Sequence, residues 1–347
     1  MPESQPLVVD GSAGGGQVLR TALSLAAVTG RAVDVDDVRG SRPAPGLHPQ
    51  HLACVECVAA ACDATVEGAE LESPAVAFDP GPIGGGDLRY DLPTAGSVSL
   101  LFDALLPLAV ALDAPLTVTA TGGTDVKWSP PLASLQHVKL PLLARVGLDA
   151  TVTRERTGFY PAGGGKATLT VRPSTLSPLS LTERGPLERV AVHSRASASL
   201  AGAEVADRQA NAAAEALSAV GFSTTIEEVA YDDTASPGSS LLLVGEYGGT
   251  RLGVDALGER GKPSEAVAAD AVEAFEDLHE AGVVLDPHLA DQLLVFLALA
   301  GGDLLAPAMT DHLRTNCDVL SAFGYEVTLE EHPDGTARVH SAGERSD

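Results

Sequence analysis

Three glycines near the N-terminus and an arginine just after them are suited to binding a phosphate. Gly14, Gly15 and Gly16 precede Arg20 at the expected junction between a strand and a helix. Backbone N–H groups at such a junction can bind an anion, and a guanidinium would add charge. The segment lacks a following Lys-Ser/Thr and does not fit the dinucleotide fingerprint, so it is neither a Walker loop nor a Rossmann turn. A tight structural turn explains it about as well.

A second group of polar residues follows within the first 51 positions. Arg39 and Arg42 come before an expected helix, and Gln50 and His51 lie at its start. Guanidinium groups match the oxygens of phosphate, so these four side chains could converge on an oxyanion. The alternative is that both arginines are surface residues paired with the aspartates at 36–37.

Two further candidates lie in the C-terminal part of the chain. Asp291 and Gln292 fall inside an apolar helical pattern over residues 288–297, where a charged residue is unusual unless it faces a site. Capping of the helix N-terminus is the simpler explanation for the acid. His312 could act as a nucleophile or base, because a neutral imidazole is available near pH 7. A structural histidine is the alternative.

The cysteines indicate core packing rather than metal binding. Cys54, Cys57 and Cys62 fall in helical rhythm among apolar residues, where cysteine acts as a small apolar filler. A zinc site would need a second pair of ligands. Cysteines this close in one helix cannot join distant parts of the chain. We therefore expect neither a zinc site nor a disulfide framework.

The elements that would position these residues follow a pattern that occurs three times. Each copy has a helix and a strand, then a second helix, a strand and a hairpin. The second helices begin near three histidines, and a valine lies 15 residues after each of them: His51 and Val66, His137 and Val152, His312 and Val327. Each unit reads β-α-β-α-β-β, which predicts a sheet with helices packed on one face.

A different pattern interrupts the third unit. Its expected strands lie near 190–195, 224–229 and 241–244, and its expected helices over 203–220 and 264–281. The predicted fold class is α/β (α+β), with a large domain of three repeated βαβαββ units, each a sheet backed by helices, and a smaller inserted α/β domain. We place the large domain at residues 1–184 and 282–347, and the insert at 185–281.

The charge of the chain is strongly negative. Its 347 residues carry a formal net charge of −25, and only four of the basic residues are lysines. This composition suggests a salt-rich cytoplasm, because molar salt screens the repulsion between surface carboxylates. No segment approaches the roughly 20 apolar residues that span a bilayer, so no membrane partner is expected. Charge alone favours a protein that does not meet nucleic acid, and any phosphate would have to be held by a few local arginines and backbone N–H groups.

Seven ordered motifs resemble the RNA 3'-terminal phosphate cyclase family, of the ATP-dependent type, along almost the full chain. They are Gly14-Gly15-Gly16-Gln17-x-Leu19-Arg20, Arg39-x-x-Arg42-x-x-Pro45-Gly46-x-x-x-Gln50-His51-Leu52, Thr94-Ala95-Gly96-Ser97, Gly122-Gly123-Thr124-Asp125 with Pro130-Pro131, Gly158-Phe159-Tyr160-Pro161-Ala162-Gly163-Gly164-Gly165, Leu289-Ala290-Asp291-Gln292-Leu293, and His312-Leu313-x-Thr315-Asn316. The resemblance implies a three-repeat large domain with a small insert.

The resemblance also implies a reaction and its residues. His312 would attack the α-phosphorus of ATP and form a histidine-adenylate, AMP would pass to an RNA 3'-phosphate end, and the 2'-hydroxyl would close a 2',3'-cyclic phosphate. A divalent metal, Mg or Mn, would neutralise the ATP phosphates. ATP or adenylate would be bound by Gly14, Gly15, Pro130, His288, Leu289, Ala290, Asp291 and Gln292, and the RNA 3'-phosphate by Arg20, Arg39, Arg42, Gln50 and His51.

Three positions depart from the family pattern. Ala13 stands where relatives often carry Glu before the glycine triplet, Ser134 where an aromatic commonly follows the double proline, and Asp103 where Gln is common. Each departure weakens the ATP pocket that the resemblance implies. We therefore expect slower adenylation, or an altered dependence on nucleotide and metal.

Two rival functions belong to other classes of protein. A non-catalytic, cyclase-like RNA-binding or rRNA-processing factor would share the fold, but such relatives lack the histidine that His312 supplies. An enolpyruvyl transferase is built from similar units, but as two halves of comparable size. The sequence leaves the oligomeric state open, with a homodimer among the states to be tested.

Overall fold

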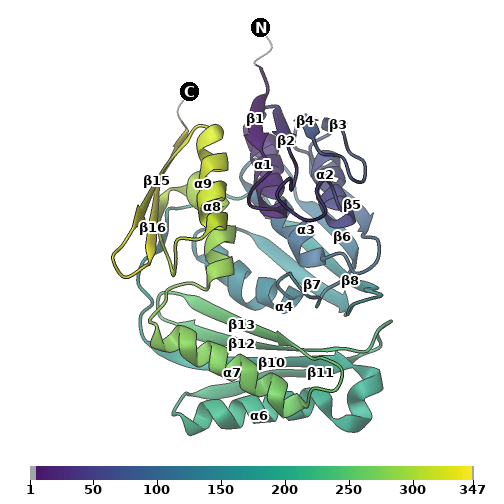
Figure 1. The fold of residues 1–347 in the computed structure, drawn as a ribbon, viewed down its shortest axis with the longest axis vertical. Coiled ribbons are helices and arrows are strands. Elements are labelled where there is room, and N and C mark those ends of the chain that lie inside the picture. Colours follow the sequence, from purple (N-terminus) through teal and green to yellow (C-terminus); the bar gives the residue numbers. More distant parts are fainter. Residues whose placement is uncertain (1–4, 346–347) are drawn as a thin grey trace.

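The computed structural model describes residues 5–345, and its first unit is a four-stranded sheet with helices on one face (Figure 1). The unit comprises β1 (Leu7–Asp10), α1 (Gly16–Thr29), β2 (Val33–Asp36), α2 (Pro49–Ala61), β3 (Thr65–Glu67) and β4 (Val76–Asp79). The strand order is β1-β2-β4-β3. β1 and β2 run parallel because α1 carries the chain back between them, whereas β3 and β4 pair as an antiparallel hairpin.

The second unit repeats this arrangement with a broken second helix. Its elements are β5 (Gly86–Asp91), α3 (Val98–Leu105), the 3₁₀ turn Leu106–Val110, β6 (Leu116–Gly122), α4 (Leu132–Ser134), the π-helical turn Leu135–Lys139, α5 (Leu140–Arg145), β7 (Ala150–Arg156) and β8 (Gly165–Val171). The strand order β5-β6-β8-β7 matches that of the first unit. Ser97 caps α3, because its hydroxyl accepts from the N–H of Leu100.

The third unit is split in sequence but not in space. It comprises β9 (Leu179–Leu181), α8 (Pro287–Ala300), β14 (Gly302–Ala306), α9 (Asp311–Ala322), β15 (Tyr325–Glu331) and β16 (Ala337–Arg345), in the strand order β9-β14-β16-β15. All three units therefore share one topology, and their helices bury a continuous apolar core. The predicted fold class is confirmed.

The insert between β9 and α8 is a sheet with two helices on one face, seen below the three units in Figure 1. It contains β10 (Leu187–Ser197), the 3₁₀ turn Ala198–Ala203, α6 (Val205–Ala219), β11 (Thr224–Asp232), β12 (Ser239–Tyr247), β13 (Arg251–Leu257) and α7 (Ser264–Glu280). A second apolar core lies under α6 and α7. The proposed division at 184/185 and 281/282 falls in the loops that flank this segment, and remains a prediction.

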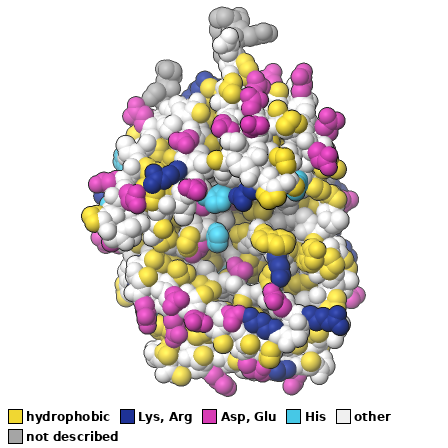
Figure 2. Space-filling view, viewed as in Figure 1, with side chains coloured by type: hydrophobic (Ala, Val, Ile, Leu, Met, Phe, Trp, Pro, Cys, Tyr) yellow, Lys and Arg dark blue, Asp and Glu magenta, His cyan; other side chains and the backbone are white. Residues whose placement is uncertain are grey.

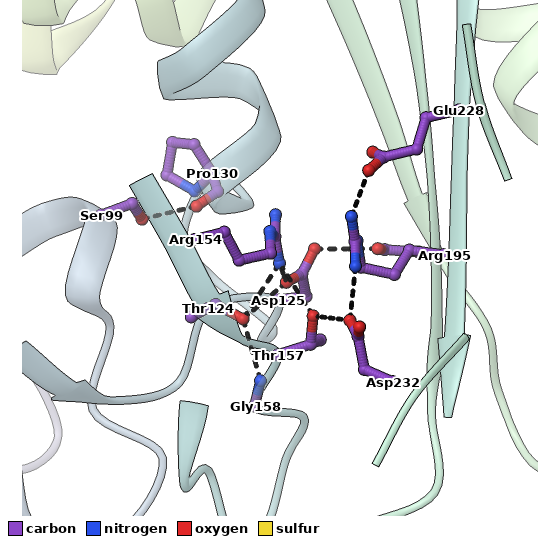
Figure 3. A network of polar contacts seen from close by, with 11 residues as sticks. Ser99, Thr124, Asp125, Pro130, Arg154, Thr157, Gly158, Arg195, Glu228 and Asp232 are labelled. Atoms are coloured by element: carbon purple, nitrogen blue, oxygen red, sulfur yellow. Dashed lines mark hydrogen bonds and ion pairs between the residues drawn. The ribbon is translucent and has the colours of Figure 1, made fainter. Parts of the chain in front are cut away.

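A buried polar network joins the second unit to the insert (Figure 3). Asp125 pairs with Arg154 and accepts a hydrogen bond of 2.8 Å from the Ser240 hydroxyl of β12. Asp232 of β11 pairs with Arg195 and accepts from the hydroxyl of Thr157. Buried charges are costly to leave unpaired, so this network fixes the insert against the second unit.

The cysteines are packed as the sequence predicted. Cys54, Cys57, Cys62 and Cys317 are all buried and free. Burial raises the pKa of each thiol, to about 11 for Cys54 and about 12 for Cys57, so they remain protonated at neutral pH. Within residues 5–345 no helix is long and apolar enough to cross a membrane.

Candidate active site

The glycine loop before α1 is in close contact with the predicted arginines. Gly14 and Gly15 have φ values of 72° and 62°, a region that side chains rarely adopt. A Cβ on Gly15 would lie 3.2 Å from a terminal nitrogen of Arg42. A Cβ on Gly16 would lie 3.3 Å from a terminal nitrogen of Arg20. Larger residues would be strained or crowded at these positions, because side chains that include two arginines approach the loop backbone closely.

His51 completes this cluster in a defined tautomer. The N–H of His48 donates to Nδ1 of His51 over 3.2 Å, so Nδ1 is an acceptor and Nε2 carries the hydrogen. Nε2 faces the loop, 2.4 Å from where a Cβ of Gly16 would lie. Burial, followed by the charges of Arg20 and Arg39, lowers the pKa of His51 to about 3. His51 is thus a neutral donor aimed at the glycine loop.

The arginines of the cluster have no acidic partners. Within the described residues, Arg20, Arg39 and Arg42 form no ion pair, and the predicted alternative of pairing with the aspartates at 36–37 is wrong. Arg39 instead donates to the backbone carbonyls of Ala44 and Gly46, over 2.8 and 3.0 Å. Burial and the neighbouring Arg42 lower its pKa. An uncompensated group of cations in a protein of net charge −25 is a candidate anion site.

Gln50 is placed beside the cluster but its amide is occupied. Its Oε1 accepts from the N–H of Ser97, and its Nε2 donates to the Ser97 carbonyl over 3.1 Å. These two bonds hold the start of α3 against α2. In this structure Gln50 positions the second unit, and its role as a phosphate ligand remains a prediction.

His312, at the start of α9, lies next to the same loop. Burial lowers the pKa of its imidazole, as do the charges of Arg42, His288 and Arg20, whereas the Gly14 backbone raises it. Nδ1 is buried and forms no hydrogen bond of normal geometry. Thr315, one turn further along α9, touches the loop from the same side: a Cβ on Gly14 would lie 2.6 Å from its hydroxyl oxygen. The imidazole of His312 is therefore close to the arginine cluster, a candidate anion site.

A narrow cavity of about 20 Å³, room for roughly one water, extends from the cluster between α1, α3 and α8. Arg20 lines it together with Asp103, Asp291, Gln292 and Asn316. Asp291 is 6% exposed, and burial raises the pKa of its carboxyl to about 6. Arg20 thus belongs to both regions and connects the arginine cluster to the predicted adenylate residues.

Sequence reasoning missed a buried lysine that contacts two of the residues lining this cavity. Lys139 is 3% exposed and pairs with Asp103, and its Nζ lies 3.4 Å from Oε1 of Gln292. The signal was present, because a lysine in the apolar run after His137 is unusual. Asp103, where the resemblance leads us to expect Gln, is therefore the charge partner of Lys139.

The remaining predicted adenylate residues divide into two groups. Leu289 and Ala290 are buried in the core, at 5% and 1% exposure, so their side chains do not reach the cluster. His288 is exposed at the start of α8, within electrostatic range of His312. The carbonyl of Pro130 accepts from the Ser99 hydroxyl over 2.6 Å. The structure brings His288 near His312 and places Asp291 and Gln292 in the cavity with Arg20, but leaves the side chains of Leu289 and Ala290 in the core.

A larger hollow, of about 320 Å³, lies between the second unit and the insert. His137 and His193 stack there with ring centroids 4.1 Å apart. Its arginines are already paired: Arg189 with Glu227 and Glu246, and Arg251 with Glu246. It contains none of the predicted site residues.

The fold defines an α/β protein built from three copies of one unit. Its candidate site is a cluster of arginines beside a histidine. The profile of the family RNA 3'-terminal phosphate cyclase matches residues 12–328. A protein of Halobacterium salinarum with that name is 48% identical over 94% of this chain and 98% of its own. One of Methanopyrus kandleri is 40% identical, covering 94% and 99% of the two chains. This chain belongs to the RNA 3'-terminal phosphate cyclase family.

A solved structure, the enolpyruvyl transferase NikO from Streptomyces tendae, is similar with a TM-score of 0.37 and 12% identity. The match covers 97% of this chain and 49% of that one. A similarity this weak carries no argument about function.

Proposed function

We propose that this protein, an enzyme of the cyclase family, uses ATP to convert RNA 3'-phosphate ends into 2',3'-cyclic phosphates. The observation that carries the proposal is that His312 lies within reach of the charges of Arg20 and Arg42, neither of which forms an ion pair within residues 5–345. Phosphate groups of both substrates could be held there while an imidazole attacks. A net charge of −25 fits a salt-rich cytoplasm, the predicted compartment.

The first step forms a covalent histidine-adenylate. Nε2 of neutral His312 attacks the α-phosphorus of ATP, an N–P bond forms, and the bond to the pyrophosphate oxygen breaks. Because burial and neighbouring cations lower the pKa of His312, the ring is neutral near pH 7 and its lone pair is available. The Gly14 backbone, which favours the protonated ring, would hold Nδ1–H as charge develops on the imidazole.

The arginine cluster then binds the RNA end. Arg20 and Arg42 would contact the terminal phosphate at the glycine loop, with the Nε2–H of His51 as a neutral donor. Charge-assisted hydrogen bonds of this kind are about twice as strong as neutral ones. They attract the RNA phosphate locally, whereas the negative net charge of the whole chain repels it.

Two further steps close the ring. A 3'-phosphate oxygen attacks the α-phosphorus, the N–P bond breaks, and His312 is returned neutral. The vicinal 2'-hydroxyl then attacks the 3'-phosphorus, AMP leaves, and the hydroxyl proton passes to solvent. Adenylation replaces a poor leaving group with AMP, which divides one difficult displacement into easier ones.

A candidate metal site is not found among the side chains that the structure describes. Among residues 5–345, no group of three or more His, Cys, Asp or Glu side chains is arranged to hold a metal ion. Ala13 stands in the loop where the resemblance leads us to expect Glu. A divalent ion, Mg²⁺ or Mn²⁺, would enter with the ATP phosphates as part of the substrate.

A cyclisation assay tests the proposal. RNA carrying a labelled 3'-phosphate is incubated with ATP and Mg²⁺ or Mn²⁺ in molar salt, and label that becomes resistant to phosphatase is measured. We expect conversion by the wild type and by His340→Ala, a surface histidine of β16, and none by His312→Ala. Arg42→Ala should raise the RNA concentration for half-maximal rate by about 10- to 100-fold. Retained RNA binding with no cyclisation in any metal would instead support the non-catalytic RNA-binding factor.

A further inference from the structure

Two large aromatic side chains are held in solvent on neighbouring loops. Trp128, the single tryptophan of the chain, is 92% exposed, and Tyr160 is 62% exposed. The backbone of Trp128 has a φ of 64°, which is a genuine outlier for a bulky residue. Exposure of this much aromatic surface at a strained position is unfavourable for an isolated protein, and such strain is concentrated at functional sites.

The two loops are joined to each other and form one edge. Residues 123–131 follow β6, and residues 157–164 connect β7 to β8. A bridge between Asp125 and Phe159 joins them, and the N–H of Thr124 donates to the Gly158 carbonyl over 2.9 Å. The buried Asp125 network ties the same edge to the insert (Figure 3). Both aromatic side chains are thus presented from fixed backbone.

This edge is continuous with the arginine cluster. Gln50, beside His51, bonds both backbone groups of Ser97. The segment before Ser97 then contacts both aromatic loops: the N–H of Gly123 donates to the Gly96 carbonyl over 2.7 Å, and a Cβ on Gly163 would lie 2.4 Å from the Thr94 carbonyl. The segment 94–97 therefore separates the predicted phosphate site from the aromatic edge.

The negative charge of the surface limits which ligands can bind this edge. Carboxylates are scattered over the face shown in Figure 2, and the net charge is −25. Lys127, the cation next to Trp128, already pairs with Glu259 at 2.9 Å. A polyanionic backbone gains little attraction here, whereas every nucleobase has a face that stacks on an aromatic ring in any salt.

We propose that Trp128 and Tyr160 form a stacking platform for the bases of the RNA strand that lead to its 3'-phosphate end. The inference rests on the proposed function, because the arginine cluster must hold that end. Binding of the strand would then depend on stacking more than on phosphate contacts, which suits a carboxylate-covered protein in molar salt.

The single tryptophan allows a direct test that does not depend on catalysis. The wild type is titrated, without ATP, with a short single-stranded RNA carrying a 3'-phosphate and with a mononucleoside 3'-phosphate. We expect the RNA to quench Trp128 fluorescence, with an affinity that changes little between about 0.5 and 2 M salt. The mononucleotide should compete at the arginine cluster without the same quenching.

Variants separate stacking from folding. Trp128→Gly relieves the positive φ, so it should be at least as stable as the wild type, yet its affinity for the RNA should fall by about 5- to 100-fold. Trp128→Phe should retain most of the affinity. The control is Val220→Ala, which removes an exposed apolar side chain at the end of α6.

Three results would overturn the platform. One is unchanged RNA affinity in Trp128→Gly. Another is an unquenched tryptophan in saturating RNA. The third is fluorescence that depends on protein concentration without RNA, because this would assign the edge to a second copy of the chain. If the wild type shows no adenylation, the proposed function is contradicted. The RNA titration would still test the platform, because it is done without ATP.

Discussion

Replacing Asp291 by Asn should stabilise the protein while impairing its reaction. Asp291 is 6% exposed in the cavity beside Arg20, and its nearest hydrogen-bond donor is the Thr310 hydroxyl at 3.4 Å. Burial raises the pKa of its carboxyl from 3.8 to about 6. The folded state therefore prefers the protonated carboxyl, and ionising it above pH 6 costs free energy.

The size of this cost follows from the pKa. A gap of about two pH units corresponds to at most about 3 kcal/mol, at about 1.4 kcal/mol per unit. The stability that the protonated Asp291 carboxyl contributes is fully present below pH 3.8 and is lost as pH rises through about 6. Asn is neutral throughout, so Asp291→Asn should be more stable by up to about 3 kcal/mol at pH 8 and nearly equal to the wild type near pH 4.

Urea denaturation at pH 4 and at pH 8, in the same molar salt, measures this difference. Adenylation at pH 8 should fall in Asp291→Asn, because a carboxylate kept at such a cost is expected to serve the site. Equal stability of the two proteins at pH 8 would refute the reasoning, and so would a gain of the same size at both pH values.

Two other predictions concern charges that face the site. Burial and the charge of Arg42 lower the pKa of His312, so the acid limb of the adenylation rate should lie below pH 6.5, and Arg42→Gln should move it upward. A pH–rate profile that does not shift would contradict the assigned proximity. Lys139→Met leaves the half-buried carboxylate of Asp103 without its partner and should destabilise the protein by about 1 to 3 kcal/mol. In urea denaturation, the double variant with Asp103→Leu added should regain most of the lost free energy of unfolding. If the effects of the two changes on that free energy simply add, the ion pair does not contribute as assigned.

Much of the fold could be predicted because a repeated pattern leaves little freedom. Val66, Val152 and Val327 lie on β3, β7 and β15, at matching places in three sheets of one topology. The insert was predicted except for β13, whose sequence Arg251–Leu257 mixes a glycine and an aspartate into a short apolar run. That strand forms because β12 offers it an antiparallel edge, which is tertiary context that local patterns do not contain.

The candidate site was only partly predictable. The types of Arg20, Arg42 and His312 suggested phosphate chemistry, and the fold brings them to one loop. The local sequence could not show that Gln50 is engaged by Ser97, because that partner is 47 positions away. Nor could it reveal Lys139 beside Asp103, because the two residues are 36 positions apart and meet only in the folded chain.

The most direct test of the account is the intact mass of the protein after incubation with ATP and Mg²⁺ or Mn²⁺ in molar salt. We predict an increase by one AMP group, located on His312 by peptide mapping, labile in acid, and absent from His312→Ala. His340→Ala should carry the adduct like the wild type. An adduct on another residue, or no adduct in folded protein with either metal, would contradict the proposal that His312 is the nucleophile.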